Sequence, residues 1–180
     1  MQATNLLRAE HASIADMLKI LSIFAVKARA GLKFDKTQAR KIVEYLLFFV
    51  DKTHQAKEEQ ILFPELIKAG MARSGGLLGM MLHEHEWSRG YIDDMGLALE
   101  ADDHESFATA AENAIELMTS HYDREDKVLF SIADEVLPAE KQEEISRQFR
   151  SAEPGRAGPG IHEFFHRFLN DLQYQYLGNA

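Results

Sequence analysis

The chain contains no cysteine among its 180 residues. This absence excludes disulfides, thiolate-held zinc, iron–sulfur clusters and cysteine nucleophiles. Basic residues are also in deficit, with 20 Lys and Arg against 29 Asp and Glu and a formal net charge of -9. Nucleic acid and anionic membrane surfaces require a basic face on the protein, so neither is an expected partner.

Long apolar runs are missing as well. The longest run, residues 76–82, is far too short to cross a bilayer. The N-terminal Met-Gln-Ala-Thr-Asn lacks the basic stretch and the following apolar block of a secretory signal. We therefore expect a soluble, cytoplasmic protein whose length suits one domain with a sizeable core.

Apolar residues recur with helical spacing in four long segments, which begin near residues 4, 36, 76 and 105. Gly31 and Gly70 are typical helix stops, and Asp35 followed by Gln38 fits an N-terminal capping box. Four long helices with short loops predict an all-α fold, an antiparallel up-down-up-down four-helix bundle over residues 1–137.

Residues 138–180 are expected to add two C-terminal helices that pack on the bundle as part of the same domain. Pro138 opens the first, a charge-rich helix that extends to about Ser151. Residues 152–160 contain two prolines and three glycines, which predicts a turn-forming linker. A last amphipathic helix is expected from about Ile161 to Leu177.

Two ten-residue stretches share one pattern. Residues 54–63 and 121–130 both read His-x-x-x-Glu-acid-x-aliphatic-Leu-Phe. In a helix, the spacing of four residues stacks His54 on Glu58, and it stacks His121 on Glu125 in the same way. Each half of the chain therefore offers a nitrogen and an oxygen ligand on one helix face.

Two more histidines complete the pattern, because His11 and His85 lie on the apolar stripes of the first and third segments. A carboxylate on a core face is costly unless it is paired or bound to metal. Six such groups suit two metal ions bridged by the glutamates, and a ligand set without sulfur favours iron or manganese, with zinc possible. The predicted metal ligands are His11, His54, Glu58, His85, His121 and Glu125.

These residues resemble the hemerythrin-like domains, also called HHE cation-binding domains, over about residues 5–135. The resemblance is carried by the two repeated stretches, which end in Leu62-Phe63-Pro64 and Leu129-Phe130, and by the pairs Glu10-His11 and Glu84-His85. It implies a four-helix bundle that holds two iron ions in a non-haem diiron centre. The four histidines would be ligands, and Glu58 and Glu125 would be the bridging carboxylates.

The resemblance also implies O2, NO or a similar small molecule as the ligand, and a role in sensing, redox or nitrosative-stress protection, or iron handling. Respiratory members carry a His-x-x-x-His pair on the third helix. Here the positions four residues before and after His85 are Met81 and Arg89. Respiratory members place an aspartate five residues after the fourth-helix histidine; that position is Asp126, but Glu125 matches the first repeat better. The missing fifth histidine favours sensing, iron handling or stress chemistry over O2 transport.

The acidic residues next to the predicted ligands are not themselves predicted to bind the metal. Glu59 and Asp126 are expected to face solvent or a neighbouring helix, or to accept hydrogen bonds from imidazole N–H groups. Glu84 is interpreted as a supporting or surface group.

Three further histidines remain as weaker candidates. His83 lies two residues from His85 and so points to a roughly opposite side of the helix. His162 and His166 have metal-type spacing, which fits either a solvent-facing pair or a ligand or gate over an open coordination position.

Two rival functions are compatible with the same sequence. One is a metal-responsive interaction module, without small-molecule chemistry, whose C-terminal helices contact a protein partner. The other is a metal-free structural bundle. The sequence identifies no particular protein partner, and it leaves open whether the chain is an enzyme that turns over peroxide or nitric oxide.

Overall fold

A computed structural model describes residues 2–157 and 161–178, with the side chains of 153–157 and 161–162 left out. The described residues form helices and no strand. None of these helices is long and apolar enough to cross a membrane. The helical segments are α1 (Ala3–Arg29), α2 (Lys36–Tyr45), η1 (Leu46–Gln55), η2 (Glu58–Leu62), α3 (Phe63–Lys68), α4 (Gly76–Glu100), α5 (His104–Arg124), η3 (Glu125–Leu129), α6 (Phe130–Val136), α7 (Ala139–Ala157), α8 (Ile161–Leu172) and η4 (Gln173–Leu177).

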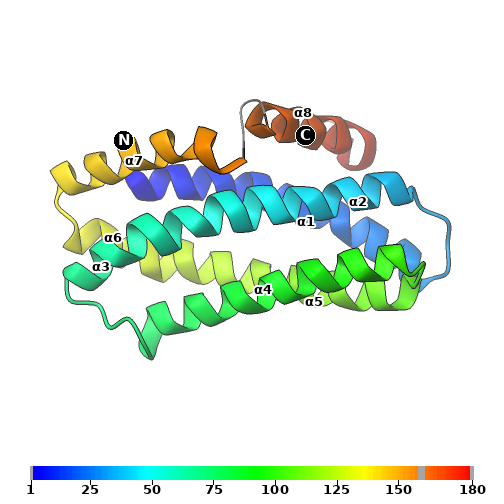
Figure 1. Ribbon diagram of the computed structural model, residues 1–180, viewed down its shortest axis with the longest axis horizontal. Helices are drawn as coiled ribbons and strands as arrows, with labels where there is room; N and C mark the ends of the chain where they lie inside the picture. Colours follow the sequence, from blue (N-terminus) through cyan, green and yellow to red (C-terminus); the bar gives the residue numbers. More distant parts are fainter. Residues whose placement is uncertain (1, 158–160, 179–180) are drawn as a thin grey trace.

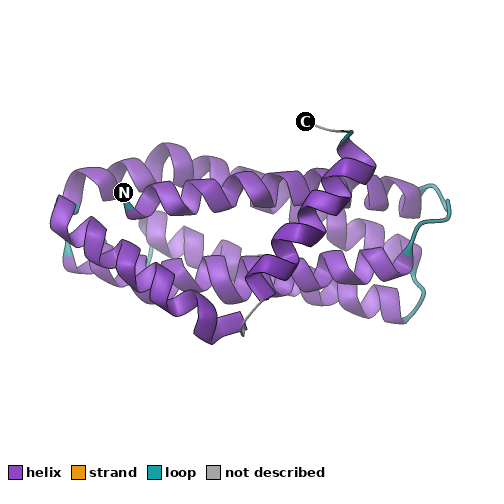
Figure 2. Cartoon of the chain, turned by 90° about the horizontal axis from the view of Figure 1, so that it is seen from above, coloured by secondary structure: helices purple, strands orange, loops and turns teal. Residues whose placement is uncertain are grey.

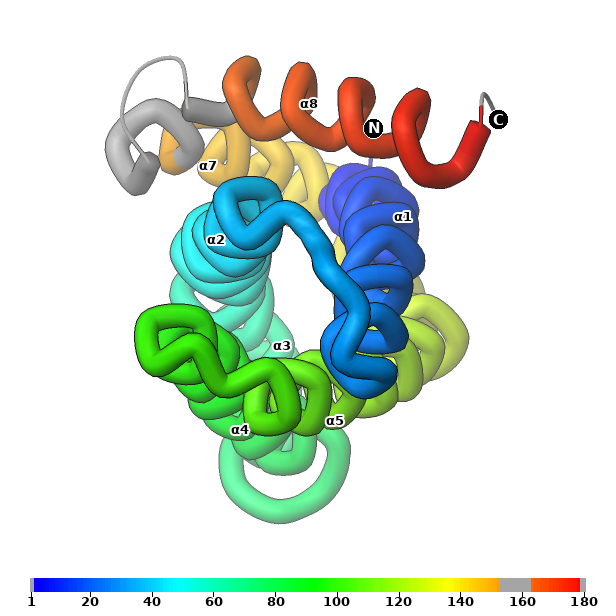
Figure 3. Tube along the Cα trace, turned by 90° about the vertical axis from the view of Figure 1, so that its right-hand side faces the viewer, coloured from blue at the N-terminus to red at the C-terminus, as the bar shows by residue number. Residues whose placement is uncertain are grey.

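The segments named η are π-helical, and they join their α-helical neighbours without a break. One continuous helix therefore runs through α2, η1, η2 and α3, and another runs through α5, η3 and α6. These two helices lie beside α1 and α4 along the longest axis of the molecule (Figure 1). Seen end-on, α1, α2, α4 and α5 surround a common centre, and α7 and α8 lie over α1 and α2 (Figure 3).

The helix ends follow the residues predicted for them. Asp35 caps α2, because its side chain accepts hydrogen bonds from the backbone N–H groups of Thr37 and Gln38 at 2.8 and 3.0 Å. Gly31 follows the end of α1 with a φ of +65°, a conformation that glycine adopts without steric cost. The backbone N–H of Leu32 then bonds back to the carbonyl oxygen of Lys27, which satisfies one of the last carbonyls of α1.

The buried apolar residues form two clusters at the two ends of the bundle. Along α1, Leu7 belongs to one cluster and Ile14 belongs to the other. Along the second long helix, Val50 and Leu62 are divided between the clusters in the same way. Buried polar side chains stand between the members of each pair, so the core contains a polar layer near its middle.

The C-terminal helices pack on the bundle, but the predicted linker at 152–160 is wrong in part. Helix α7 continues to Ala157, because an interior proline can kink a helix without ending it. Residues 158–160 lie outside the described part of the chain. Figure 2 shows the last helix crossing over the bundle at an angle. Its own side chains Phe165, Leu169 and Leu172 are buried against the bundle.

Candidate metal centre

Both predicted bridging glutamates stand at the first residue of a π-helical segment. Glu58 begins η2, and Glu125 begins η3. Pro64 follows η2 closely, but Ser131 occupies the matching position after η3. Because the second repeat makes the same π-helical turn without proline, the proline is not its cause. Short π-helical turns inside α-helices are frequent at functional sites, because the extra residue shifts which side chains face inward.

The four predicted ligand histidines form two pairs in the polar layer. The Nε2 atoms of His11 and His54 lie 3.1 Å apart, and those of His85 and His121 also lie 3.1 Å apart. All four side chains are buried. Each pair joins two neighbouring long helices, so the repeat in the sequence becomes a pseudo-two-fold arrangement in space.

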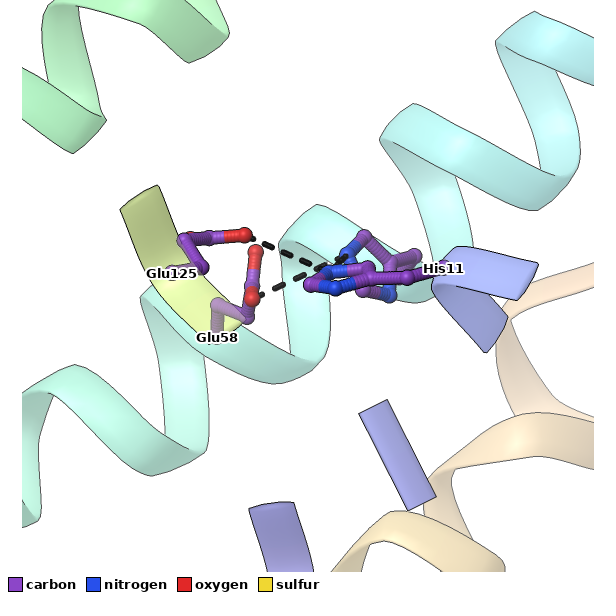
Figure 4. Close-up of side chains that lie close together, drawn as sticks. His11, Glu58 and Glu125 are labelled. Atoms are coloured by element: carbon purple, nitrogen blue, oxygen red, sulfur yellow. Dashed lines mark hydrogen bonds and ion pairs between the residues drawn. The ribbon is translucent and has the colours of Figure 1, made fainter. Parts of the chain in front are cut away.

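The two glutamates lie between the histidine pairs, and each of them reaches both. Oε2 of Glu125 is 3.3 Å from Nε2 of His11 and 3.3 Å from Nε2 of His121. Oε1 of Glu58 is 3.7 Å from Nε2 of His54, and its Oε2 is 3.4 Å from Nε2 of His85. Figure 4 shows both carboxylates directed toward His11. The arrangement is that of two sites that share two carboxylates.

The donor set fits a metal site. Two groups of four side chains, one for each histidine pair together with both glutamates, keep their ligand atoms within 4.8 Å of one another. Glu58 and Glu125 are fully buried, and their four carboxylate oxygens have no hydrogen-bond partner among the described residues. Buried anions without donors are costly, and bound cations would satisfy them.

A second ring of carboxylates orients the imidazoles from outside. Nδ1 of His54 bonds to Glu10 at 2.8 Å, and Nδ1 of His121 bonds to Glu84 at 2.8 Å. In each case the carboxylate belongs to the residue that precedes the other histidine of the pair. The sequence pairs Glu10-His11 and Glu84-His85 therefore act across helices, because each supplies one histidine to the centre and one acceptor to the partner histidine.

The remaining two imidazoles use the residues that follow the bridging glutamates. Nδ1 of His85 bonds to Glu59 at 2.7 Å, and Nδ1 of His11 bonds to Asp126 at 2.9 Å. All four Nδ1 atoms are thus engaged, which leaves every Nε2 directed at the centre. Hydrogen bonds of this kind fix the ring orientation of metal-binding histidines.

Cationic side chains hold three of these outer carboxylates, and the sequence analysis missed that role. Lys57, which is buried, contacts Glu10, and Arg124 contacts Glu84. Arg89 donates hydrogen bonds to Glu59 at 3.1 Å. A signal was present, because Lys57 and Arg124 each stand three residues after the histidine of the repeat.

In the metal-free site, the surrounding charges favour the protonated forms of His11 and His85 and the ionised form of Glu125. Burial alone would lower the pKa of His11, but the hydrogen bond to Asp126 and the nearby carboxylate of Glu125 raise it to about 9. Burial alone would likewise lower the pKa of His85, and Glu58 and Glu59 raise it to about 9. Burial would raise the pKa of Glu125, yet the surrounding histidines bring it to about 2. Metal ions would have to displace these imidazole protons.

Aromatic rings line the centre on both sides. The ring of Tyr122 lies 4.4 Å from that of His11, centroid to centroid, while Phe130 stacks on the same imidazole at 5.4 Å and Phe63 stacks on His85 at 6.0 Å. The Tyr122 hydroxyl is buried and has no hydrogen-bond partner among the described residues. The first repeat has Gln55 at the position equivalent to Tyr122, and the Gln55 side chain bonds to Ser88.

Two of the three weaker histidine candidates lie away from this centre. His83 is exposed and pairs with Glu86. His166 is exposed and contacts the ring of Phe49, at 6.1 Å between centroids. The side chain of His162 lies outside the described residues.

Comparison with known families gives a match that includes the residues of the candidate site. The family model of the hemerythrin HHE cation-binding domain matches residues 2–133. Comparisons with curated proteins and with solved structures gave no match. The matched range includes all six side chains of the two candidate sites. The chain belongs to the hemerythrin family of HHE cation-binding domains.

Proposed function

We propose that this chain is a non-haem diiron protein that binds O2 or a related small molecule for sensing, for redox or nitrosative-stress protection, or for iron handling. The observation that carries the proposal is the position of Glu58 and Glu125, each of which reaches one histidine of both pairs. The proposal takes the four long helices as an up-down-up-down bundle, supported by the connections at alternate ends in Figure 1.

The residues of the chain would divide the work as follows. His11 and His54 would hold one ion, His85 and His121 would hold the other, and the two glutamates would bridge them. When bound, a pair of iron ions supplies exchangeable electrons and coordination positions for a small ligand. The buried aromatic rings of Tyr122, Phe63 and Phe130 would limit access of water to the centre.

Imidazole and carboxylate ligands without sulfur suit iron. Four histidines, rather than the five of respiratory hemerythrins, favour sensing or protective chemistry over O2 transport. A metal-free structural bundle explains the site poorly, because two fully buried carboxylates would then face only imidazole Nε2 atoms at 3.3 to 3.7 Å.

The test begins with anaerobic purification, metal analysis and optical spectra before and after O2 is admitted. We expect two iron ions per chain and a spectral change on exposure to O2. His85→Ala should abolish both, whereas His83→Ala is the matched control, because His83 is on the same helix but exposed. The proposal would be disproved if the wild-type protein bound no metal. It would also be disproved if His85→Ala and His83→Ala gave the same metal content and the same spectral change with O2.

A second candidate function, the metal-responsive interaction module, is favoured by one contact. Lys57, which holds Glu10, also lies over the ring of Phe149 on α7, 5.9 Å from its centroid. Lys57 thus connects Glu10, which bonds to His54, with the C-terminal extension. This function predicts that metal removal increases proteolysis within 138–180 and that the loaded protein does not react with O2.

A further inference from the structure

A groove beside the centre leads from the surface to one of the predicted ligands. It has a volume of about 560 Å³ and runs between α1 and α5, with His11, Tyr122 and Asp126 among its lining residues. Small side chains, Ala12 and Ala15, form part of its α1 wall. The groove therefore reaches the His11 imidazole from outside the bundle.

On the pseudo-symmetric side of the centre, beside His85, no groove between the described residues reaches a predicted ligand. A groove of about 430 Å³ lies there, and none of the six predicted ligands lines it. Arg89 fills this side, because its guanidinium bonds to both Glu59 and Asp51. Arg89 stands four residues after His85, and the residue four after His11 is Ala15. A single pair of equivalent positions thus distinguishes the two faces.

The outer carboxylates show the same asymmetry. Glu10, Glu84 and Glu59 each contact a lysine or arginine side chain. The carboxylate of Asp126 is 39% exposed, and within the described part of the chain its only partner is His11. Two cations line the groove, but their ion pairs are with other carboxylates: Arg8, which also reaches the backbone oxygen of Asp126 at 3.5 Å, pairs with Asp134 at 3.4 Å, and Lys19 pairs with Asp16 at 2.7 Å.

We infer that this groove is the path by which a divalent cation reaches and leaves the centre, with Asp126 as the carboxylate that first meets the ion. The inference rests on the proposed metal centre and names the residues that load it. An exposed carboxylate attracts a hydrated divalent ion, and Asp126 is already bonded to the histidine that would receive it. The other three imidazoles are held by carboxylates that are themselves fixed by cations.

The test measures the rate of metal uptake, using Co²⁺ as the probe. The metal-free full-length protein is mixed with excess Co²⁺ in a stopped-flow instrument, and the visible absorption of the bound ion is followed. Asp126→Asn removes the charge at the mouth of the groove, and Ala15→Arg places at the equivalent position the cation that closes the other face. Ala15 is exposed, and arginine is a good helix former, so the fold should persist.

Two matched controls separate the path from other effects. Glu86→Gln removes an exposed carboxylate of α4 that lines neither groove. Ala9→Arg adds the same charge at another exposed position of α1 that does not line the groove. Circular dichroism of each variant checks the helical content.

We expect Asp126→Asn and Ala15→Arg each to lower the association rate constant about tenfold, since one unit charge acts on a divalent ion at close range. Glu86→Gln and Ala9→Arg should keep the wild-type rate constant. Wild-type rates in both Asp126→Asn and Ala15→Arg would overturn the path while leaving the metal centre standing. Failure of the wild-type protein to bind Co²⁺ would overturn both.

Discussion

The carboxylate of Glu84, on α4, accepts a hydrogen bond from Nδ1 of His121, on α5, across 2.8 Å. Glu84 precedes His85 in the sequence, yet it supports the histidine of the neighbouring helix. Burial alone would raise the pKa of Glu84, but the bond to His121 and the charge of Arg124 lower it. The carboxylate is thus kept ionised as an acceptor, and the two helices are tied together at the centre.

Replacement of Glu84 should therefore weaken metal binding without removing a ligand. We expect Glu84→Gln to reduce the affinity for the ion held by His85 and His121 by about 10–100-fold, because the orienting hydrogen bond is weakened. A competition titration against a coloured chelator measures this. Glu86→Gln is the matched control, since Glu86 lies two residues further on α4 and is exposed. Equal affinities in the two variants would contradict the assignment.

Removal of a bridging carboxylate should affect both metal sites. Glu125 approaches His11 of one pair and His121 of the other at 3.3 Å. We expect Glu125→Gln to lower the stoichiometry from two ions to none, because each ion would lose an anionic ligand. Native mass spectrometry distinguishes this result from retention of a single ion, which would show that the glutamate serves one site only.

Stability of the metal-free protein should depend on pH in a defined direction. The pKa values of His11 and His85 rise from 6.5 to about 9, so their contribution is complete below pH 6.5 and is lost as pH rises through 9. The pKa of Glu125 falls from 4.5 to about 2, so its contribution is present above pH 4.5 and is lost toward pH 2. The free energy of unfolding of the metal-free protein should therefore be greatest between about pH 4.5 and pH 6.5.

Urea unfolding of the metal-free protein at several pH values measures this dependence. Metal-loaded protein should show the opposite trend on the alkaline side, because binding requires unprotonated imidazoles and so improves as pH rises. A metal-free protein that gains stability between pH 6.5 and 9 would contradict the raised pKa values of the two histidines.

The hydroxyl of Tyr122 should cost stability rather than add to it. It is buried and unpartnered among the described residues, as is that of Tyr45. We expect Tyr122→Phe and Tyr45→Phe each to leave the free energy of unfolding of the metal-free protein unchanged or to raise it by about 1 kcal/mol. Only Tyr122 lies against the ligand histidines, so only Tyr122→Phe should alter the optical spectrum of Co²⁺-loaded protein. Loss of stability in Tyr122→Phe would indicate an unrecognised partner for its hydroxyl.

The helices and the six ligand candidates could be predicted from the sequence because both depend on local spacing. Apolar periodicity predicted the long helices, and Asp35 and Gly31 marked two of their ends. The spacing of four residues placed each histidine beside its glutamate in the repeats. These features depend on the geometry of one helix, which the order of residues largely determines.

Tertiary structure decided how those groups combine. Spacing within a helix cannot reveal that Glu10 supports His54, that Glu84 supports His121, or that buried Lys57 and Arg124 fix those carboxylates, because each contact joins different helices. No residue in the repeats predicts the π-helical turns at the two glutamates either. The contrast between Ala15 and Arg89 gains meaning only when the bundle brings each beside an outer carboxylate. The sequence by itself determined the types of the candidate ligands and their helical spacing, because both depend on one helix, whereas packing between helices decided which side chains support them and which of them a surface groove reaches.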